Sequence, residues 1–86
     1  MQGFSYIIKN PNGLHIEPAS KIIKLAATFV SSINLRCQSR AVSLKSSIFG
    51  LMGLGLSYGD IVEVYFDGSD EEQASQAFQQ LFQQVL

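Results

Sequence analysis

The sequence predicts an α+β fold in which three helices cover one face of a four-stranded antiparallel sheet. Two observations carry this prediction. Apolar and polar residues alternate in four short segments, which is typical of half-buried strands, while helical spacing or a short apolar run marks three others. Each segment has a single apolar face, so the elements can bury these faces only by packing as two layers. The predicted order is strand, helix, strand, strand, helix, strand, helix.

The first strand and the turn after it are marked by a change in composition. Phe4, Tyr6 and Ile8 alternate with polar or edge positions, which predicts a strand with these three residues on one face. The segment Asn10–Gly13 then contains proline, which lacks a donor, and asparagine and glycine, which tolerate positive φ. A turn is therefore expected at residues 10–13.

The first helix is predicted to begin at Ile16, where the apolar period changes. Its apolar face is formed by residues at helical spacing: Ala19, Ile22, Ile23, Ala26 and Val30. Pro18 fits this helix only in the first turn, where its missing N–H removes no helical bond. This requirement places His15 at or next to the N-cap.

The middle of the chain predicts a hairpin followed by a short helix. Two alternating runs flank the segment Gln38–Arg40, which is expected to form the hairpin turn. The alternating residues are Ile33, Leu35 and Cys37 before the turn, and Val42 and Leu44 after it. The apolar, glycine-containing run Ile48–Leu56 predicts a brief helix that ends in a loop, and Ser57–Asp60 predicts a turn.

The last strand and helix have the clearest patterns. Val62, Val64 and Phe66 alternate with polar or aromatic residues, which predicts a strand. Ser69 and Glu72 have the spacing of a capping box at the start of the last helix. The apolar face of this helix consists of Ala74, Ala77, Phe78, Leu81, Phe82 and Val85.

Length and composition limit the function. The chain has 86 residues, 47% hydrophobic and 15% charged, with a formal net charge of −1. This predicts one globular domain, residues 1–86. No basic run is dense enough to follow a nucleic-acid backbone, and no apolar stretch approaches the roughly 20 residues that span a bilayer. Met1–Ser5 lacks a signal-peptide pattern, and the lone Cys37 cannot form an internal disulfide, so we expect a cytoplasmic location.

The residues that could support other chemistry have ordinary explanations. One histidine and one cysteine are too few for a zinc site or a catalytic triad. Cys37 alternates with apolar neighbours, so we expect it in the core or at the hairpin edge. The acidic cluster Asp67, Asp70, Glu71 and Glu72 is explained by the dipole at the start of the last helix. We therefore predict no metal and no cofactor.

His15, the only histidine, is the strongest candidate for chemistry. It precedes a helix whose first N–H groups are unpaired and carry partial positive charge, an environment that accepts anions. A free nitrogen of a neutral imidazole at this position can attack phosphorus. The alternative, which local sequence leaves open, is that His15 is an ordinary surface or capping residue.

Two segments resemble a known family. Residues 12–19, Asn-Gly-Leu-His-Ile-Glu-Pro-Ala, resemble the phosphohistidine signature of HPr, the histidine-containing phosphocarrier of the phosphoenolpyruvate-dependent sugar phosphotransferase system, whose usual form is Gly-Leu-His-x-Arg-Pro-Ala. Residues 47–55 resemble the segment around that family's regulatory serine. Length and element order match over essentially the whole chain. The implied HPr-like open-faced β-sandwich agrees with the two-layer prediction.

The resemblance implies a phosphoryl carrier and not a turnover enzyme. His15 would accept a phosphoryl group on Nδ1 from enzyme I and pass it to a sugar-specific A component. Asn12, Gly13 and Pro18 match the supporting positions of the motif. The implied carrier needs no cofactor, and its role as a shuttle between partners makes a monomer the natural expectation.

Glu17 departs from the family motif, which has arginine two residues after the histidine. In the family this arginine helps to hold the phosphoryl group, whereas a carboxylate repels it. With water-like screening at about 6 Å, the repulsion is roughly 1 to 1.5 kcal/mol. His15 is therefore expected to accept a phosphoryl group less readily and to release it more readily. An acidic residue in the first turn also has a benign explanation, since it complements the helix dipole.

The resemblance leaves alternatives open for the regulatory serine and for the partner surface. Counting forward from His15 gives Ser46 as the regulatory serine, whereas counting backward from Leu54 gives Ser47; either could instead cap the short helix. If an HPr kinase/phosphatase acts here, the added charge would impede docking. The resemblance implies a partner surface made of Ile16, Ser20, Lys24, Ile48, Leu51 and Met52, although Ile48 and Leu51 would also fit the core.

Three functions remain open at this point. The first is a phosphocarrier with altered thermodynamics or partner choice because of Glu17. The second is a non-transferring regulatory or docking module of the same fold. The third is a carrier dedicated to a specialised donor that supplies the missing positive charge. Retention of His15 within its full turn favours a carrier, because a docking module would not need an imidazole.

Overall fold

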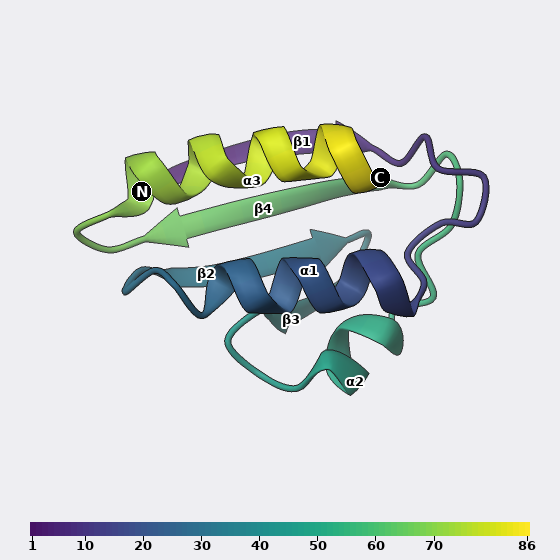
Figure 1. The fold of residues 1–86 in the computed structure, drawn as a ribbon, viewed down its shortest axis with the longest axis horizontal. Coiled ribbons are helices and arrows are strands. Elements are labelled where there is room, and N and C mark those ends of the chain that lie inside the picture. The colour runs from purple at the N-terminus through teal and green to yellow at the C-terminus, as the bar shows by residue number, and fades with distance from the viewer.

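The computed structural model describes residues 1–86 and confirms the predicted order of elements (Figure 1). The strands are β1 (Gln2–Ile7), β2 (Ser32–Cys37), β3 (Arg40–Ser43) and β4 (Ile61–Asp67). The helices are α1 (Ile16–Ala26), α2 (Ile48–Met52) and α3 (Glu71–Val85). None of the helices is both long enough and apolar enough to cross a membrane.

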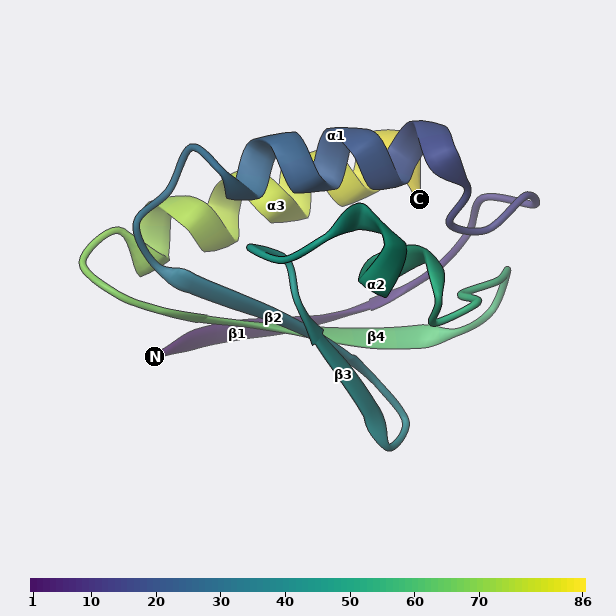
Figure 2. The ribbon, with the colours of Figure 1, turned by 90° about the horizontal axis from the view of Figure 1, so that it is seen from below.

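The four strands form one antiparallel sheet in the order β1-β4-β2-β3. All three helices lie on the same face of this sheet, and the opposite face carries no helix (Figure 2). Helix α1 packs against α3 on one side and against α2 on the other. The predicted two-layer arrangement is confirmed.

The core lies between the sheet and the helix layer, where the period of each strand and helix turns apolar side chains inward. Val62, Val64 and Phe66 are fully buried because β4 is a central strand. Phe78 and Phe82 of α3 are also fully buried, and their rings meet edge to face with centroids 6.1 Å apart. An aromatic pair of this kind contributes about 0.5–1.5 kcal/mol beyond the burial of its area.

The first helix is shorter than the spacing predicts, and the placement of Val30 on its apolar face is wrong. Helix α1 ends at Ala26, and Val30 is 76% exposed. The carboxylate of Asp70 accepts hydrogen bonds from the N–H groups of Val30, at 2.9 Å, and Ser31, at 3.0 Å. These bonds hold the chain after the helix in a loop, so a residue 40 positions away helps to fix where this segment lies.

The predicted capping box at the start of α3 is also wrong. Asp70, not Ser69, is the N-cap, and its side chain is turned toward Ser31 instead of the helix. Glu71 takes the place expected for Glu72, since its Oε1 accepts a hydrogen bond from the N–H of Gly68 at 3.1 Å. This correction shifts the start of the helix by one residue.

The predicted hairpin is confirmed with a tighter turn. Arg40 belongs to β3 and pairs with Cys37, so the turn consists of Gln38 and Ser39. The guanidinium of Arg40 donates a 2.7 Å hydrogen bond to the carbonyl of Gly53, which fastens the hairpin to the end of α2. Cys37 is half-buried beside this turn, at the position expected for a core or hairpin-edge residue.

Candidate functional site

His15 occupies the N-cap of α1, as predicted. Its backbone is extended, with φ −100° and ψ −171°, and its carbonyl accepts a hydrogen bond from the N–H of Ala19 at 3.1 Å. The imidazole makes no capping hydrogen bond and is half-buried. The backbone of His15 therefore serves the helix, while its ring remains available for chemistry.

The start of α1 leaves backbone donors without acceptors. The first helical bond runs from Ala19 to His15, and Pro18 has no N–H to offer. The N–H groups of Ile16 and Glu17 therefore remain unpaired at the end of the helix. Their partial positive charge and the helix dipole favour an anion beside His15.

The turn before His15 is held rigidly by its own hydrogen bonds and by a distant loop. The N–H of Asn12 donates to Oδ1 of Asn10, and the N–H of Gly13 donates to the Asn10 carbonyl, both at 2.9 Å. Gly13 has φ 65°, and a Cβ there would lie 2.6 Å from the carbonyl oxygen of Leu56. That same oxygen accepts the N–H of Leu14 at 3.0 Å. Only glycine fits this close approach, so the turn positions the following histidine.

The flanking residues anchor His15 on both sides. Leu14 is 6% exposed and belongs to the core cluster, and Pro18 is buried in the first turn of α1. An imidazole between two buried neighbours cannot move far with its backbone. The predicted supporting residues Asn12, Gly13 and Pro18 therefore lie in the same short segment as His15, where each has a definable structural effect.

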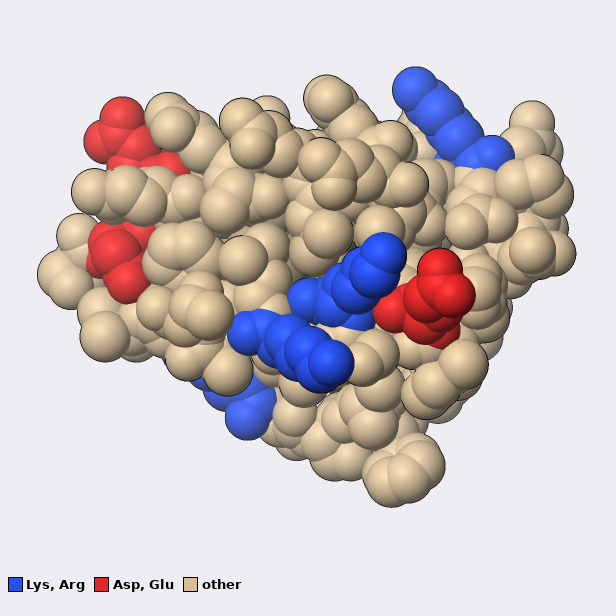
Figure 3. Space-filling view, in the orientation of Figure 1, with Lys and Arg blue, Asp and Glu red and all other residues tan.

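Glu17 is exposed in the first turn of α1 and forms no ion pair. The other charged residues of α1, Lys21 and Lys24, are also exposed and unpaired. Figure 3 shows two basic side chains close together over α1 with an acidic one beside them. Because a helix rises 1.5 Å per residue, Lys24 lies about 13 Å along the axis from His15. Lys24 therefore cannot replace the arginine that Glu17 displaces.

The structure distinguishes the two candidate serines. Ser47 is the N-cap of α2, and its Oγ accepts a hydrogen bond from the N–H of Phe49 at 3.0 Å. Ser46 lies outside the helix, where its own N–H donates to the carbonyl of Ser43. Both serines are exposed. Ser47 therefore has the capping role that the sequence left open between the two.

The predicted partner surface is partly wrong. Leu51 is fully buried, because it is the residue of α2 that faces the core, and it cannot contact a partner. Ile16 is 60% exposed, and Ser20 is partly exposed on the same helix. Ile48 and Met52 are partly buried against the core, with part of each side chain still accessible.

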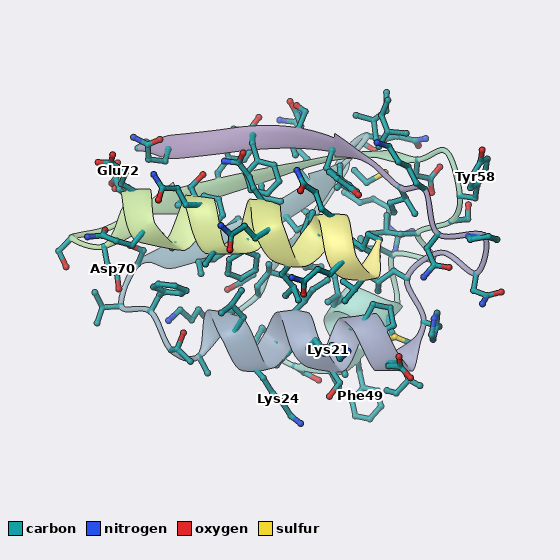
Figure 4. The ribbon with its side chains drawn as sticks, turned by 45° about the horizontal axis from the view of Figure 1, so that its top comes forward. Lys21, Lys24, Phe49, Tyr58, Asp70 and Glu72 are labelled. Atoms are coloured by element: carbon teal, nitrogen blue, oxygen red, sulfur yellow. The ribbon has the colours of Figure 1, made fainter.

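Phe49 is the exposed apolar residue that the sequence interpretation missed. It is 81% exposed and projects from α2 at the edge of the molecule below α1 (Figure 4). A helix of five residues is too short for periodicity to reveal which side chain faces outward. Phe49 therefore leaves a large aromatic side chain in water beside the half-buried Ile48 and Met52.

Burial and hydrogen bonds displace the pKa values of several ionisable groups in other parts of the fold. Burial raises the pKa of the Cys37 thiol, which lowers the fraction of reactive thiolate. A hydrogen bond from the Ser31 hydroxyl lowers the pKa of Asp70, and one from the N-terminal amino group lowers that of Glu71. No three histidine, cysteine or carboxylate side chains converge to hold a metal ion.

Comparisons of sequence agree on one family. The family model described as the phosphorylation site of the PTS HPr component matches residues 3–84. Phosphocarrier protein HPr of Lysinibacillus sphaericus is 36% identical over 85 residues, which cover 99% of this chain and 96% of the relative. The HPr of Mycoplasma genitalium is 38% identical over 74 residues, covering 86% and 84% of the two chains.

Solved structures agree with this result. A mycoplasma histidine-containing phosphocarrier protein matches with a TM-score of 0.93 at 34% identity, covering 98% of this chain and 94% of its own. An HPr of Thermoanaerobacter tengcongensis matches with a TM-score of 0.90 at 37% identity, covering 96% and 92%. The fold, the motif around His15 and these relatives lead to one conclusion: the chain belongs to the HPr family, whose members are phosphocarriers of the phosphotransferase system and not catalysts.

Proposed function

We propose that His15 is the residue of this phosphocarrier that accepts the phosphoryl group, on Nδ1. The observation that carries the proposal is a half-buried imidazole without a capping hydrogen bond, beside the unpaired N–H groups of Ile16 and Glu17. A bond forms between the ring nitrogen and phosphorus as the bond from phosphorus to the donor breaks. The reverse exchange then passes the group to the acceptor, so the carrier is restored without net consumption.

Enzyme I is the proposed donor, and a sugar-specific A component is the proposed acceptor. Both partners would dock on the surface around His15, where Ile16 and Phe49 are strongly exposed and Met52 is partly accessible. Apolar side chains of this kind suit a surface that must fit two different proteins, and the flexible thioether of Met52 adapts easily. We expect a cytoplasmic monomer, because a shuttle must leave one partner before it meets the next.

Glu17 makes the proposed site weaker than one with arginine at this position. Its carboxylate is exposed and unpaired, so its charge is not neutralised within the chain. Repulsion of the phosphoryl group lowers the equilibrium constant for acceptance by about tenfold, and absence of the arginine's attraction adds a similar factor. Compared with a carrier that has arginine at this position, this carrier would accept a phosphoryl group less readily and, once phosphorylated, donate it more readily.

Ser46 and Ser47 are the proposed positions of regulation by an HPr kinase/phosphatase. Ser47 is next to the docking residues Ile48 and Phe49, so a phosphate there would add charge to an apolar contact surface. Phosphate on Ser47 would also replace the hydroxyl that caps α2. A phosphate on Ser46 would leave this cap intact, so the two sites differ in their effect on the helix.

The second candidate function is a docking module of the HPr fold that does not transfer phosphate. Glu17 is the observation that favours it, because a carboxylate beside the histidine opposes phosphorylation. A third reading keeps the carrier but assigns it to a specialised donor that brings its own positive charge to Glu17. The two carriers differ from the module in whether His15 is ever phosphorylated.

Phosphoryl transfer from phosphoenolpyruvate through a generic enzyme I, followed by intact mass, tests these alternatives. The wild type should gain one phosphoryl group, and Glu17→Gln should raise the equilibrium constant for labelling by about tenfold, with Glu17→Arg adding a further factor of about ten. Glu72→Arg is the matched control, because it makes the same change of charge at the far end of the helix layer (Figure 4).

The outcomes separate the three functions. No labelling of the wild type or of Glu17→Arg would leave only the docking module. Labelling of Glu17→Arg alone would indicate a carrier that needs a specialised donor. Equal labelling of the wild type and both Glu17 variants would contradict the proposed effect of the carboxylate.

A further inference from the structure

A groove between α1 and α3 lies outside the proposed phosphoryl site. Its volume is about 520 Å³, within the range of ligand-binding clefts. Leu25, Ala77 and Leu81 form its half-buried floor, with Lys21 on the α1 edge and Gln80 and Gln84 on the α3 edge. The floor is apolar and both edges are polar.

Most of this groove is on a different flank of α1 from the residues proposed to dock enzyme I, although Lys24, four residues after Ser20, borders both. Consecutive residues of a helix are rotated by about 100°, so Lys21 and Leu25 share one flank, whereas Ile16 and Ser20 share another. Helix α1 packs against α2 on one side and α3 on the other. A protein seated in the groove would therefore not need to cover the imidazole of His15.

The charges around the groove have one sign. Lys21 and the adjacent Lys24 form no ion pair, although Glu17 is on the same helix. On the opposite edge, α3 contains no charged residue after Glu72. A strip of positive charge therefore borders the apolar floor, and Glu17, one helical turn before Lys21, offsets only part of it.

The glutamines of α3 lower the cost of covering the groove. The side-chain amides of Gln80 and Gln84 are exposed and make no hydrogen bond within the chain, so their donors and acceptors are free. Removing an amide from water costs much less than removing a charge, provided that the amide regains its hydrogen bonds. An uncharged helix face beside an apolar floor is suited to contact with another protein.

We propose that this groove docks an acidic amphipathic helix of a partner protein. The lining residues on this side run from Lys21 in α1 to Thr28, two residues past its end, which is about 10 Å or two helical turns. Apolar side chains at i and i+4 of the partner helix would enter the floor over Leu25 and Leu81, as in other helix-in-groove complexes. Carboxylates flanking them would face Lys21, and the partner's polar groups would bond to the free amides.

Other anionic partners fit the groove less well. Recruitment to an anionic membrane takes clusters of roughly four to eight basic residues. A nucleic acid is held by a comparable number of phosphate contacts, about 6–10. Lys21 and Lys24 are the only basic residues lining the groove, and the floor between them and α3 is apolar. An acidic amphipathic helix would contact both the two lysines and the apolar floor, whereas a surface of phosphates would contact only the lysines.

The test uses the full chain and a synthetic helical peptide of about 12 residues, with leucines at i and i+4 and glutamates beside them. Titration is followed by fluorescence anisotropy at low salt, and the binding site is mapped from backbone NMR shifts of the labelled protein. A second peptide with lysine in place of each glutamate is the matched ligand control. We expect the acidic peptide to shift resonances around Leu25 and Leu81, and the basic peptide to bind at least tenfold more weakly.

Three variants locate the contact. Lys21→Glu should weaken binding of the acidic peptide about tenfold, because a rim attraction becomes a repulsion. Gln80→Glu should weaken it several-fold from the opposite edge, since it places a carboxylate in the groove. Lys9→Glu is the control of equal charge change, because exposed Lys9 lies outside the groove.

Several results would overturn the proposal. Binding of the acidic peptide that shifts α2 and His15 instead of the groove would do so, as would an equal loss of affinity in Lys9→Glu and Lys21→Glu. Absence of binding at millimolar peptide would also reject it. If the protein bound phosphatidylserine vesicles more tightly than the acidic peptide, the groove would be assigned to a membrane surface instead.

Discussion

The two long helices begin at opposite ends of the molecule, and their N-termini are built in opposite ways (Figure 1). The start of α3 is occupied by the chain itself: Asp70 accepts hydrogen bonds from Val30 and Ser31, and Glu71 accepts one from Gly68. The start of α1 has no such side chain. Its first N–H groups are unpaired, and the half-buried imidazole of His15 makes no capping hydrogen bond.

This difference separates a structural helix start from a functional one. At α3 the carboxylates of Asp70 and Glu71 complement the dipole and accept hydrogen bonds from loop N–H groups, so this end of the helix fastens two loops together. At α1 no side chain accepts a hydrogen bond from the first N–H groups, and the proposed function places the phosphoryl group of His15 beside them.

The largest effect is expected where the turn before His15 meets the loop after α2. Gly13→Ala should cost about 3 kcal/mol of unfolding free energy, because it combines a residue at positive φ with a close contact to the Leu56 carbonyl. Gly55→Ala is the control, since Gly55 has a similar φ of 64° but open space around it, and it should cost about 1–2 kcal/mol. Urea denaturation measures the free energy of unfolding of both variants. Equal losses would show that the close approach of Gly13 to the Leu56 carbonyl does not affect stability.

A smaller loss is expected when the carboxylate that fills the α3 end is neutralised. Asp70→Asn should lower the free energy of unfolding, because the amide nitrogen that replaces one oxygen cannot accept an N–H bond, so either Val30 or Ser31 loses its acceptor. The Ser31 hydroxyl holds the pKa of Asp70 below its usual value, so the charged form stabilises the fold. This contribution is fully present above the pKa of the unfolded state and disappears as the pH falls through the lower folded pKa.

The pH dependence gives this prediction its control. The difference in stability between the wild type and Asp70→Asn should stay constant from about pH 7 to about pH 5 and shrink below about pH 4. Glu72→Gln removes a neighbouring charge that makes no side-chain hydrogen bond, and it should show no comparable trend. A wild-type advantage that persists unchanged to pH 2 would mean that Asp70 does not stabilise the fold through its charge.

Ser47→Ala tests a third helix start, at α2. Loss of the hydroxyl that accepts the N–H of Phe49 should cost about 1 kcal/mol. Ser46→Ala, one residue earlier, should be close to neutral because Ser46 caps no helix. Thermal unfolding of the two variants compares them directly, and a larger loss for Ser46→Ala would reverse the assignment of the cap.

The smallest effect on stability is expected at Phe49, where the effect on function should be clear. Phe49→Ala removes an exposed ring, so the midpoint of unfolding should not change by more than the error. Phosphorylation by enzyme I at limiting carrier should nevertheless become slower by several-fold, because docking loses an apolar contact. Val30→Ala is the control, since Val30 is an apolar residue that is 76% exposed beyond the opposite end of α1. Equal rates for all three proteins would remove Phe49 from the docking surface.

The features predicted correctly from sequence are those that depend on near neighbours. Pro18 must be in the first turn of a helix, which places His15 at the N-cap without any knowledge of the rest of the fold. The strand around Val64 follows from alternation in the same way. The family resemblance added the expected chemistry to a position that local reasoning had already identified.

The errors occur where distant contacts decide the structure. Val30 has the spacing of a helical residue, but Asp70 binds its N–H from 40 positions away. Asp70 is the N-cap of α3, but its side chain bonds to the distant Ser31, so the local sequence pattern favours Ser69 as the cap. Leu51 and Phe49 share a helix too short for periodicity to tell the buried side from the exposed one. The structural roles of these residues follow only from the three-dimensional fold.

The most direct test of the central claim is NMR of the protein after phosphorylation by phosphoenolpyruvate and enzyme I, with ring nitrogens of histidine labelled. We expect a single phosphoramidate on Nδ1 of His15, absent from His15→Ala, while the Asp70 end of the helix layer keeps its wild-type resonances. Phosphate found only on a serine, or no phosphoramidate even in Glu17→Arg, would contradict the account.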